Sequence, residues 1–298
     1  MTGFLLSHQA LLNLCLLNVL LAQSQYIVLR AGVFSMATAG IAAIGAYTSG
    51  YLMLRQGLQP ALAIALAGGV GLLASMILAL PLVRLRGVFQ AIATLAFVQI
   101  VMSLVLYAER YTGGATGLNG IAKSVDTWHL LAVVAAVSFV LAQLGRSPTG
   151  RAFDTIRQDE TVAVSLGIDV ARHHLLAFAL SGFVAGIAGA MMAAHNYSVA
   201  HGEFGFGMMI AVLSYVVLGG RRSVAGPLVG AIVLTLLPEI ARPLADNRMV
   251  IYGALLIATI IYLPDGVVDT WLLQRHRRRR QVEDAARRAA EPPLGAGA

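Results

Sequence analysis

Residues 60–82 read PALAIALAGGVGLLASMILALPL, a run without a single charged side chain. A helix needs about 20 mostly apolar residues to cross the ~30 Å hydrocarbon core of a bilayer, so this run is long enough to span a membrane. Runs of the same kind recur on both sides of it. We expect nine spans, at residues 9–29, 33–54, 60–82, 88–107, 128–144, 174–194, 205–220, 227–242 and 249–264. The sequence therefore predicts an all-α, polytopic transmembrane helical bundle of about nine spans, within a range of eight to ten.

The composition of the whole chain supports the same class. Of its 298 residues, 58% are hydrophobic and only 12% are charged, against about 25% charged in ordinary globular domains. A soluble protein with so few charges lacks the polar surface that faces water, and a disordered chain would not carry so much apolar surface. The single cysteine, Cys15, excludes an internal disulfide and a cysteine metal cage.

The positive charge of the chain is concentrated near its C-terminus. The net charge is +7, and residues 273–298 contain seven arginines against three acidic residues. A basic stretch directly after a span is typical of a cytoplasmic anchor that faces anionic lipid, and we prefer this reading to nucleic-acid binding. We therefore expect a transmembrane permease domain over residues 1–272, a disordered tail over 273–298, a cytoplasmic C-terminus and an external N-terminus.

Small residues are placed where helices would pack closely. Gly182 and Gly186 form one GxxxG pair, and Gly226 and Gly230 form another. This spacing lets transmembrane helices approach backbone to backbone, and we expect packing inside the bundle rather than a dimer interface. The span at 33–54 is rich in Gly, Ala, Ser and Thr, which predicts a broken or re-entrant helix.

One loop, residues 145–173, is much longer than the others. Ser147 can cap a helix that starts at Pro148, Asp159 can cap a second short helix, and Gly167 can end it in the left-handed conformation. The apolar residues then form two faces: Phe153 with Ile156, and Val162 with Ala163 and Leu166. The same amphipathic pattern suits a helix pair on the membrane surface or a docking element for a cytoplasmic partner.

Several kinds of chemistry are missing. Lys123, the only lysine, follows Ala122, so the chain has no Walker A loop. The spans carry few ionisable residues, which argues against proton- or sodium-coupled transport. We find no catalytic constellation and expect no enzyme activity, no cofactor and no metal site. His195, His201 and Glu203 surround a predicted outside loop, where ordinary surface chemistry is more frequent than a zinc site.

Read together, several motifs resemble a known family. They are LVRLRGVFQAIATLAF at 82–97, TGGATGLNGI at 112–121, RSPTGRA at 146–152, LGID at 166–169, GPLVGA at 226–231 and LPDG at 263–266. From about residue 32 to 266, the chain resembles the permease subunits of high-affinity branched-chain amino acid ABC transporters. It is more similar to the second of the two permease types in those systems.

The resemblance implies a bacterial inner-membrane transport subunit without its own ATPase. Its partners would be a second homologous permease, two ATP-binding subunits, an external solute-binding protein and membrane lipids, with no nucleic acid. Loop 146–170 would couple the permease to the ATPase and flip the pathway between outward-open and inward-open states. By motif position, the docking residues would be Gly150, Arg151, Ala152, Arg157, Glu160, Ala163, Leu166 and Gly167.

The chain departs from the family pattern in two places. Residues 32–38 read GVFSMAT where the family usually has G-Q-x-S-x-G-H, so Val33, Ala37 and Thr38 replace Gln, Gly and His. If this segment borders the pathway, the candidate pathway residues are Ser35, Thr38 and Gly40. Arg222 stands in place of the usual glycine, beside Arg221. The alternative functions are a self-sufficient secondary carrier or channel and a membrane-embedded enzyme.

Overall fold

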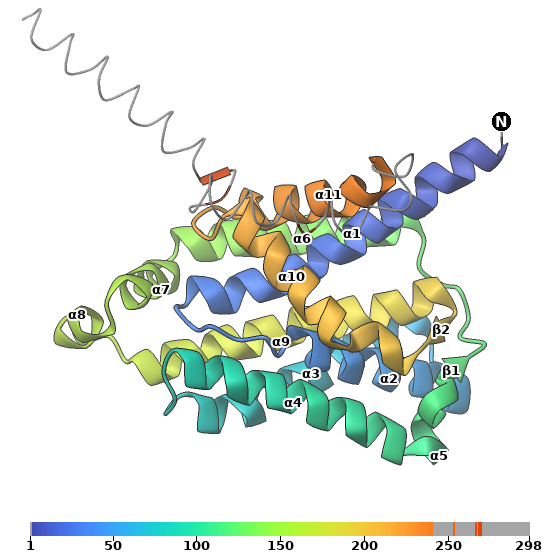
Figure 1. Cartoon of the computed structure of the whole chain (residues 1–298), viewed down its shortest axis with the longest axis horizontal. Coiled ribbons are helices and arrows are strands. Elements are labelled where there is room, and N and C mark those ends of the chain that lie inside the picture. The colour runs from blue at the N-terminus through green and yellow to red at the C-terminus, as the bar shows by residue number, and fades with distance from the viewer. Residues whose placement is uncertain (1, 241–252, 254–265, 267, 270–298) are drawn as a thin grey trace, which may run out of the picture.

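The computed structural model describes residues 2–240 together with 253, 266, 268 and 269. Most of its long helices run roughly along one axis, and α10 crosses them obliquely (Figure 1). In chain order the helices are α1 Thr2–Arg30, α2 Thr38–Gln56, α3 Pro60–Leu82, α4 Val88–Tyr107, α5 Glu109–Thr112, α6 Thr127–Arg146, α7 Pro148–Gln158, α8 Glu160–Ser165, α9 Val170–Asn196, α10 Phe206–Gly219 and α11 Ala225–Ile240. Two short 3₁₀ turns, η1 Gly114–Thr116 and η2 His201–Phe204, and two strands, β1 Leu118–Asn119 and β2 Ser198–Val199, complete the described part.

The long apolar runs of the sequence are helices. Five described helices are long and apolar enough to cross a membrane: α1 over Gln9–Arg30, α3, α4, α6 and α9. Helices α10 and α11 are apolar but shorter. The expected span at 249–264 lies outside the described residues. The all-α membrane architecture is thus confirmed, while the number of nine spans stays a prediction.

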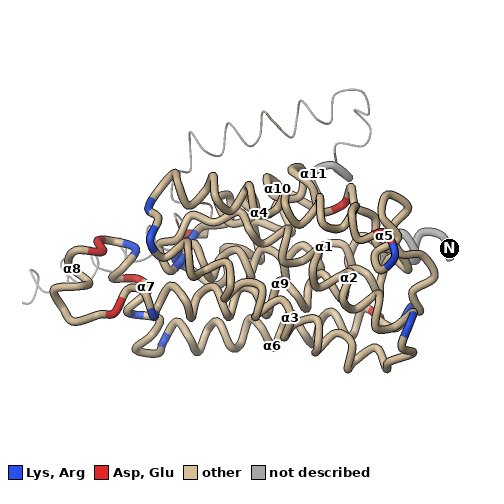
Figure 2. The backbone as a smooth tube through the Cα atoms, turned by 90° about the horizontal axis from the view of Figure 1, so that it is seen from below, with Lys and Arg blue, Asp and Glu red and all other residues tan. Residues whose placement is uncertain are grey.

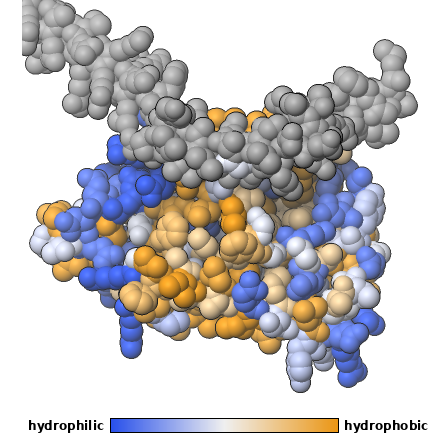
Figure 3. Space-filling view, viewed as in Figure 1, coloured by the Kyte–Doolittle hydropathy of each residue, from blue (hydrophilic) through white to orange (hydrophobic). Residues whose placement is uncertain are grey.

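Charged residues gather at the two ends of the bundle, with few between them (Figure 2). A broad hydrophobic area separates these ends on the face shown in Figure 3. Helices α7 and α8 form one end, which we call the α7–α8 end (Figure 1). At the opposite end β1 pairs antiparallel with β2, with Leu118 opposite Val199. This distribution is the one that a bilayer requires, because charges are costly in hydrocarbon.

A line of glycines brings α9 against α2 and α3. A Cβ on Gly186 would lie 2.5 Å from the Ala67 carbonyl oxygen of α3, and a Cβ on Gly45 of α2 would lie 2.3 Å from the Gly186 oxygen. A Cβ on Gly182 would lie 2.2 Å from the Cβ of Ser75 in α3. The small residues therefore serve contacts inside the chain, where lipid offers helices no hydrophobic driving force to associate.

The second glycine pair makes similar contacts between α10 and α11. A Cβ on Gly230 would lie 1.9 Å from the Tyr215 carbonyl oxygen, and one on Gly226 would lie 2.3 Å from the Gly220 oxygen. No side chain larger than hydrogen fits these contacts without moving the backbone.

The break expected within 33–54 lies before α2. Helix α1 ends at Arg30, residues 31–37 are not helical, and α2 starts at Thr38. The Gln25 amide Nε2 donates to the Ser35 carbonyl oxygen at 2.5 Å, and the Thr38 hydroxyl donates to the Gln25 amide oxygen at 2.6 Å. Irregular backbone at membrane depth needs such partners, because lipid supplies none.

The three candidate pathway residues thus lie in a packed interior. Ser35 and Thr38 are buried, and their polar groups take part in hydrogen bonds with neighbours in the chain. A Cβ on Gly40 would lie 3.2 Å from Phe97 and Val98. Their contacts account for a structural role, and their role in a pathway stays a prediction.

The glycine contacts of α9 lead to a stability prediction. Gly186→Ala places a methyl group against the α3 backbone, and we expect it to lower the free energy of unfolding by roughly 1–3 kcal/mol, as overpacking does. Gly69→Ala in α3 is the matched control, because a Cβ there meets nothing within 4 Å. Thermal unfolding in detergent compares the two variants, and equal melting temperatures would contradict the close contact.

Candidate functional site

The long loop folds into two short helices that begin and end where the sequence predicts. The Ser147 hydroxyl accepts a hydrogen bond from the Gly150 N–H at 3.2 Å, and Pro148 opens α7. The Asp159 carboxylate accepts from the N–H groups of Thr161 at 2.7 Å and Val162 at 3.3 Å, which caps α8. Gly167 follows α8 with a φ of 79°. These three helix signals are confirmed.

The carboxylate of Asp159 is stabilised by the cap that it forms. Hydrogen bonds from the backbone N–H groups of Val162 and Thr161 lower the pKa of this carboxyl below its ordinary value. The cap is therefore intact above the ordinary aspartate pKa and weakens as the pH falls through the lowered value.

The two helices present their apolar residues in opposite directions. In α7, Phe153 and Ile156 are fully buried. In the α8 region, Val164 is 61% exposed and Leu166 is 68% exposed, while Ala163 is buried. The expected common face of Val162, Ala163 and Leu166 is wrong. Ala163 packs inward, where α8 contacts α7 and α9, whereas Val162 is exposed and Leu166 lies beyond the end of α8, at its C-cap. The loop is thus held by α7 and exposes an apolar tip at α8.

An ion pair ties α7 to the end of α1. The Arg30 guanidinium donates to both carboxylate oxygens of Asp154, from Nη2 at 2.9 Å and from Nε at 3.2 Å. Its Nη1 donates to the Tyr26 hydroxyl at 3.3 Å. The Arg30 side chain is only 7% exposed and that of Asp154 is 35% exposed, so the guanidinium is shielded from water while the carboxylate is partly open to it. A bidentate arginine–carboxylate pair fixes orientation as well as position.

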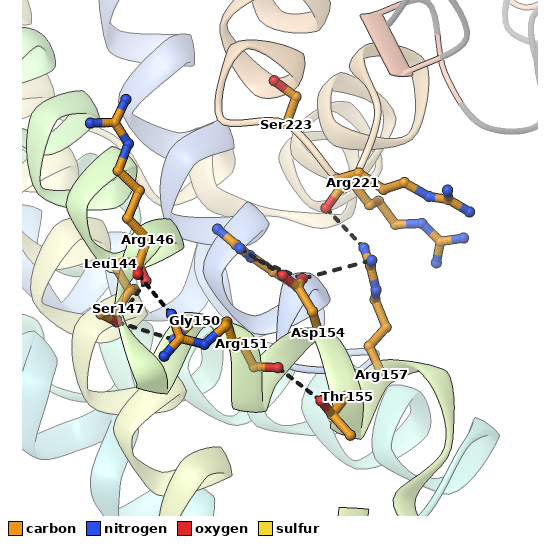
Figure 4. A network of polar contacts seen from close by, with 12 residues as sticks. Leu144, Arg146, Ser147, Gly150, Arg151, Asp154, Thr155, Arg157, Arg221 and Ser223 are labelled. Atoms are coloured by element: carbon orange, nitrogen blue, oxygen red, sulfur yellow. Dashed lines mark hydrogen bonds and ion pairs between the residues drawn. The ribbon is translucent and has the colours of Figure 1, made fainter. Parts of the chain in front are cut away.

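A second tether joins α7 to the turn between α10 and α11. Arg157 Nη1 donates to the Arg221 carbonyl oxygen at 3.1 Å, and Arg157 also lies 3.7 Å from Asp154 (Figure 4). A Cβ on Gly32 would lie 3.1 Å from the Arg157 Cα, so the segment after α1 packs directly on α7. The α7–α8 loop is therefore attached to three parts of the bundle.

The eight predicted docking residues have different surroundings. Gly150 is structural: a Cβ there would lie 2.1 Å from the Leu144 carbonyl oxygen at the end of α6. Ala152 and Ala163 are buried. Arg157 forms the tether described above. The other four lie at or near the surface: Arg151, Glu160, Leu166 and Gly167. Arg151 donates to the Arg146 carbonyl oxygen, and Glu160 lies 3.3 Å from Arg86.

Sequence reasoning missed Arg30 and Asp154 as partners. Neither residue was singled out from the sequence. The sequence shows only the local half of each contact: Tyr26 lies one helical turn before Arg30, and Asp154 lies three residues before Arg157 in α7. The separation of 124 residues between Arg30 and Asp154 hid the pair.

At the opposite end of the bundle, α1, α9, η2 and α10 line an open pocket of about 470 Å³. Polar groups from Asn18, His195, Glu203 and Tyr215 line it together with apolar residues. Burial raises the pKa of the Glu203 carboxyl above its ordinary value. Within the part of the chain that the structure describes, no three His, Cys, Asp or Glu side chains are grouped closely enough to hold a metal ion.

The sequence from residue 8 to residue 260 matches the family described as "Branched-chain amino acid transport system / permease component". The chain belongs to this family. The described helices and the protruding α7–α8 loop are thus those of a multi-pass membrane permease. No solved structure matches the chain.

Three curated relatives show how the similarity is distributed. The high-affinity branched-chain amino acid transport system permease protein LivM of Salmonella typhimurium is 33% identical, over 85% of this chain and 66% of its own length. The fructose import permease protein FrcC of Rhizobium meliloti is 24% identical, over 87% of this chain and 76% of its own. LivH of Escherichia coli, a branched-chain amino acid permease protein, is 24% identical over 54% of this chain and 51% of its own.

The partly buried Arg30–Asp154 pair predicts a clear difference between two substitutions. Asp154→Asn leaves the Arg30 guanidinium without its counter-charge, and we expect a loss of about 2 kcal/mol in the free energy of unfolding. Asp169→Asn is the control: it removes an exposed pair with Arg172 but keeps a residue that caps α9 well, so we expect less than about 0.5 kcal/mol. Thermal unfolding of both variants checks this, and equal losses would contradict a special role for Asp154.

Proposed function

We propose that this chain is a membrane-spanning permease subunit of an ABC importer for branched-chain amino acids. Two facts support the proposal: the family to which the chain belongs, and the higher identity to a branched-chain amino acid permease than to a fructose permease. ATP hydrolysis would come from separate subunits, and an external solute-binding protein would deliver the amino acid.

The observation that carries the proposal is the α7–α8 loop. Its α7 helix is anchored by the Arg30–Asp154 pair, while Val164 and Leu166 at its tip are exposed beyond the charged end of the bundle. Exposed apolar side chains that are grouped and rimmed by charges are typical of a surface that another protein covers, and Val162, Val164 and Leu166 form such a group. In the proposed complex the covering surface is a groove on an ATP-binding subunit, and the α7–α8 end faces the cytoplasm.

The rigid attachment of the loop suits it for coupling. Force on α8 would reach α9 directly through the Asp169 cap and would reach α1 through Asp154. Closure of the ATP-binding subunits would then switch the bundle between outward-open and inward-open states. Ser35, Thr38 and Gly40 would act in this switch through the packing of the segment before α2.

A second permease chain would complete the pathway. The similarity to both LivM and LivH, two permease proteins of one kind of transport system, supports pairing with a homologous chain. The competing function, a carrier or channel that works alone, predicts transport without any ATP-binding subunit.

Substitutions of Leu166 test the coupling role. Leu166→Asp places a charge in the proposed contact, and we expect uptake of leucine by the assembled transporter to fall about tenfold or more, as at interface hot spots. ATP-binding subunits should also co-purify less well. Leu166→Met keeps an apolar side chain of similar volume and should retain near-normal uptake and co-purification.

Arg151→Glu offers a second variant at the exposed side of α7. We expect it to uncouple ATP hydrolysis from uptake while the protein still inserts into the membrane. Gly150→Asp would be a poor probe, because its side chain clashes with α6. Normal uptake in both Leu166→Asp and Arg151→Glu would contradict the coupling assignment.

A further inference from the structure

The pocket at the end opposite α7 and α8, which we call the η2 pocket, has the size of a ligand site. Its volume of about 470 Å³ lies within the range of about 300–1,000 Å³ that small-molecule sites occupy. Its lining runs from Ala10 to Asn18 on α1 and from Gly207 to Tyr215 on α10. The pocket therefore follows each of these helices for about two turns from the end of the bundle inward (Figure 1).

Glu203 of η2 places an unpaired carboxylate in this pocket. Its side chain is partly buried, and this burial raises the pKa of the carboxyl above its ordinary value. Within the part of the chain that the structure describes, its carboxylate oxygens take part in no ion pair and no hydrogen bond. A charge that is removed from water without a partner is costly. A positively charged group on a ligand would supply the missing partner.

Two further side chains of the η2 pocket can form hydrogen bonds with a ligand. His195 Nδ1 is enclosed without a hydrogen-bond partner among the described residues, so Nε2 is the ring nitrogen that a ligand can reach. Asn18 Nδ2 donates to the Thr235 hydroxyl at 2.9 Å, so the Oδ1 of the same amide is the atom that can accept from a ligand. Together with Glu203, these groups suit a molecule that carries both an ammonium group and a carboxylate.

The rest of the lining is largely apolar. Leu14 of α1, Met192 of α9 and Met208 of α10 contribute to it. Methionine side chains are flexible and adapt to aliphatic groups of different shapes. A sugar would place hydroxyl groups against this wall and has no positive charge for the Glu203 carboxylate. The combination of one carboxylate with an apolar wall therefore favours a small aliphatic amine or amino acid.

We propose that the η2 pocket binds an aliphatic amino acid, with its ammonium group against the Glu203 carboxylate. The carboxylate of the ligand would accept a hydrogen bond from His195 Nε2, and its side chain would lie against the apolar wall. The inference rests on the proposed function. In an importer whose α7–α8 end faces the cytoplasm, the η2 pocket lies at the entrance of the pathway, where a solute-binding protein would release the amino acid.

Binding of two related ligands to the full chain in detergent tests the ammonium contact. Saturation-transfer NMR titration compares leucine with 4-methylpentanoate, which has the same carbon skeleton without the ammonium group. We expect 4-methylpentanoate to bind at least about tenfold more weakly, because it loses a hydrogen-bonded contact between opposite charges. Equal binding of the two ligands, or no binding of leucine, would overturn the proposal. Tighter binding of fructose than of leucine would also overturn it.

A matched pair of substitutions separates Glu203 from a general effect of charge. Glu203→Gln keeps the shape of the side chain, and we expect leucine to bind about tenfold more weakly, so that its advantage over 4-methylpentanoate narrows. Glu109→Gln removes an exposed carboxylate of α5, at the same end but outside the η2 pocket, and should leave leucine binding unchanged (Figure 1). The melting temperature of Glu203→Gln should not fall, because the substitution removes an unpaired charge. An unchanged advantage of leucine in Glu203→Gln would overturn the proposal.

Uptake by the complete transporter separates a failure of this proposal from a failure of the proposed function. We expect ATP-dependent uptake of leucine to fall in Glu203→Gln and to stay normal in Glu109→Gln. Normal uptake in Glu203→Gln would overturn the η2 pocket as a solute site and would leave the importer standing. Leucine binding that depends on Glu203, without any ATP-dependent uptake, would support the site and would contradict the proposed function.

Discussion

The close approach of α9 to α2 and α3 is the constraint on which the rest of the structure depends. In a bilayer, helices gain little by burying apolar side chains, because lipid tails are equally apolar. Gly45, Gly182 and Gly186 allow backbone contact instead, and a Cβ at any of them would overlap a neighbouring helix. Helix α9 runs from the Asp169 cap beside α8 to Asn196 beside β2, so this one contact connects both ends of the bundle.

The α7–α8 end combines a firm base with an exposed tip. Phe153 and Ile156 bury the inner side of α7, and the Arg30–Asp154 pair fixes its direction. Leu166 remains outside, at the far side of a helix of only six residues. This combination suits transmission of force better than a flexible loop would, because movement of the tip is passed to α1 and α9 together.

Features set by neighbours in sequence were predictable, and those set by distant residues were not. The apolar runs and the caps at Ser147 and Asp159 depend on nearby residues, so the helices of the described part and the loop's two helices could be predicted. The Arg30–Asp154 pair joins residues 124 positions apart, and no local pattern marks it. Ser35 and Thr38 read as polar residues near a pathway, because the sequence does not reveal that Gln25 engages both. The burial of Ala163 beside the exposed Val162 was not predictable either, because the side of α8 that faces inward is set by its packing against α7 and α9.

The central claim is that this bundle moves its solute only when ATP-binding subunits act on the α7–α8 end. The most direct test is leucine uptake into proteoliposomes that contain the chain alone, or the chain with a homologous permease, the ATP-binding subunits and a solute-binding protein. We expect uptake only in the complete assembly, and only with ATP supplied on the side of the α7–α8 loop. Uptake by the chain alone, without ATP, would contradict it and would identify a self-sufficient carrier.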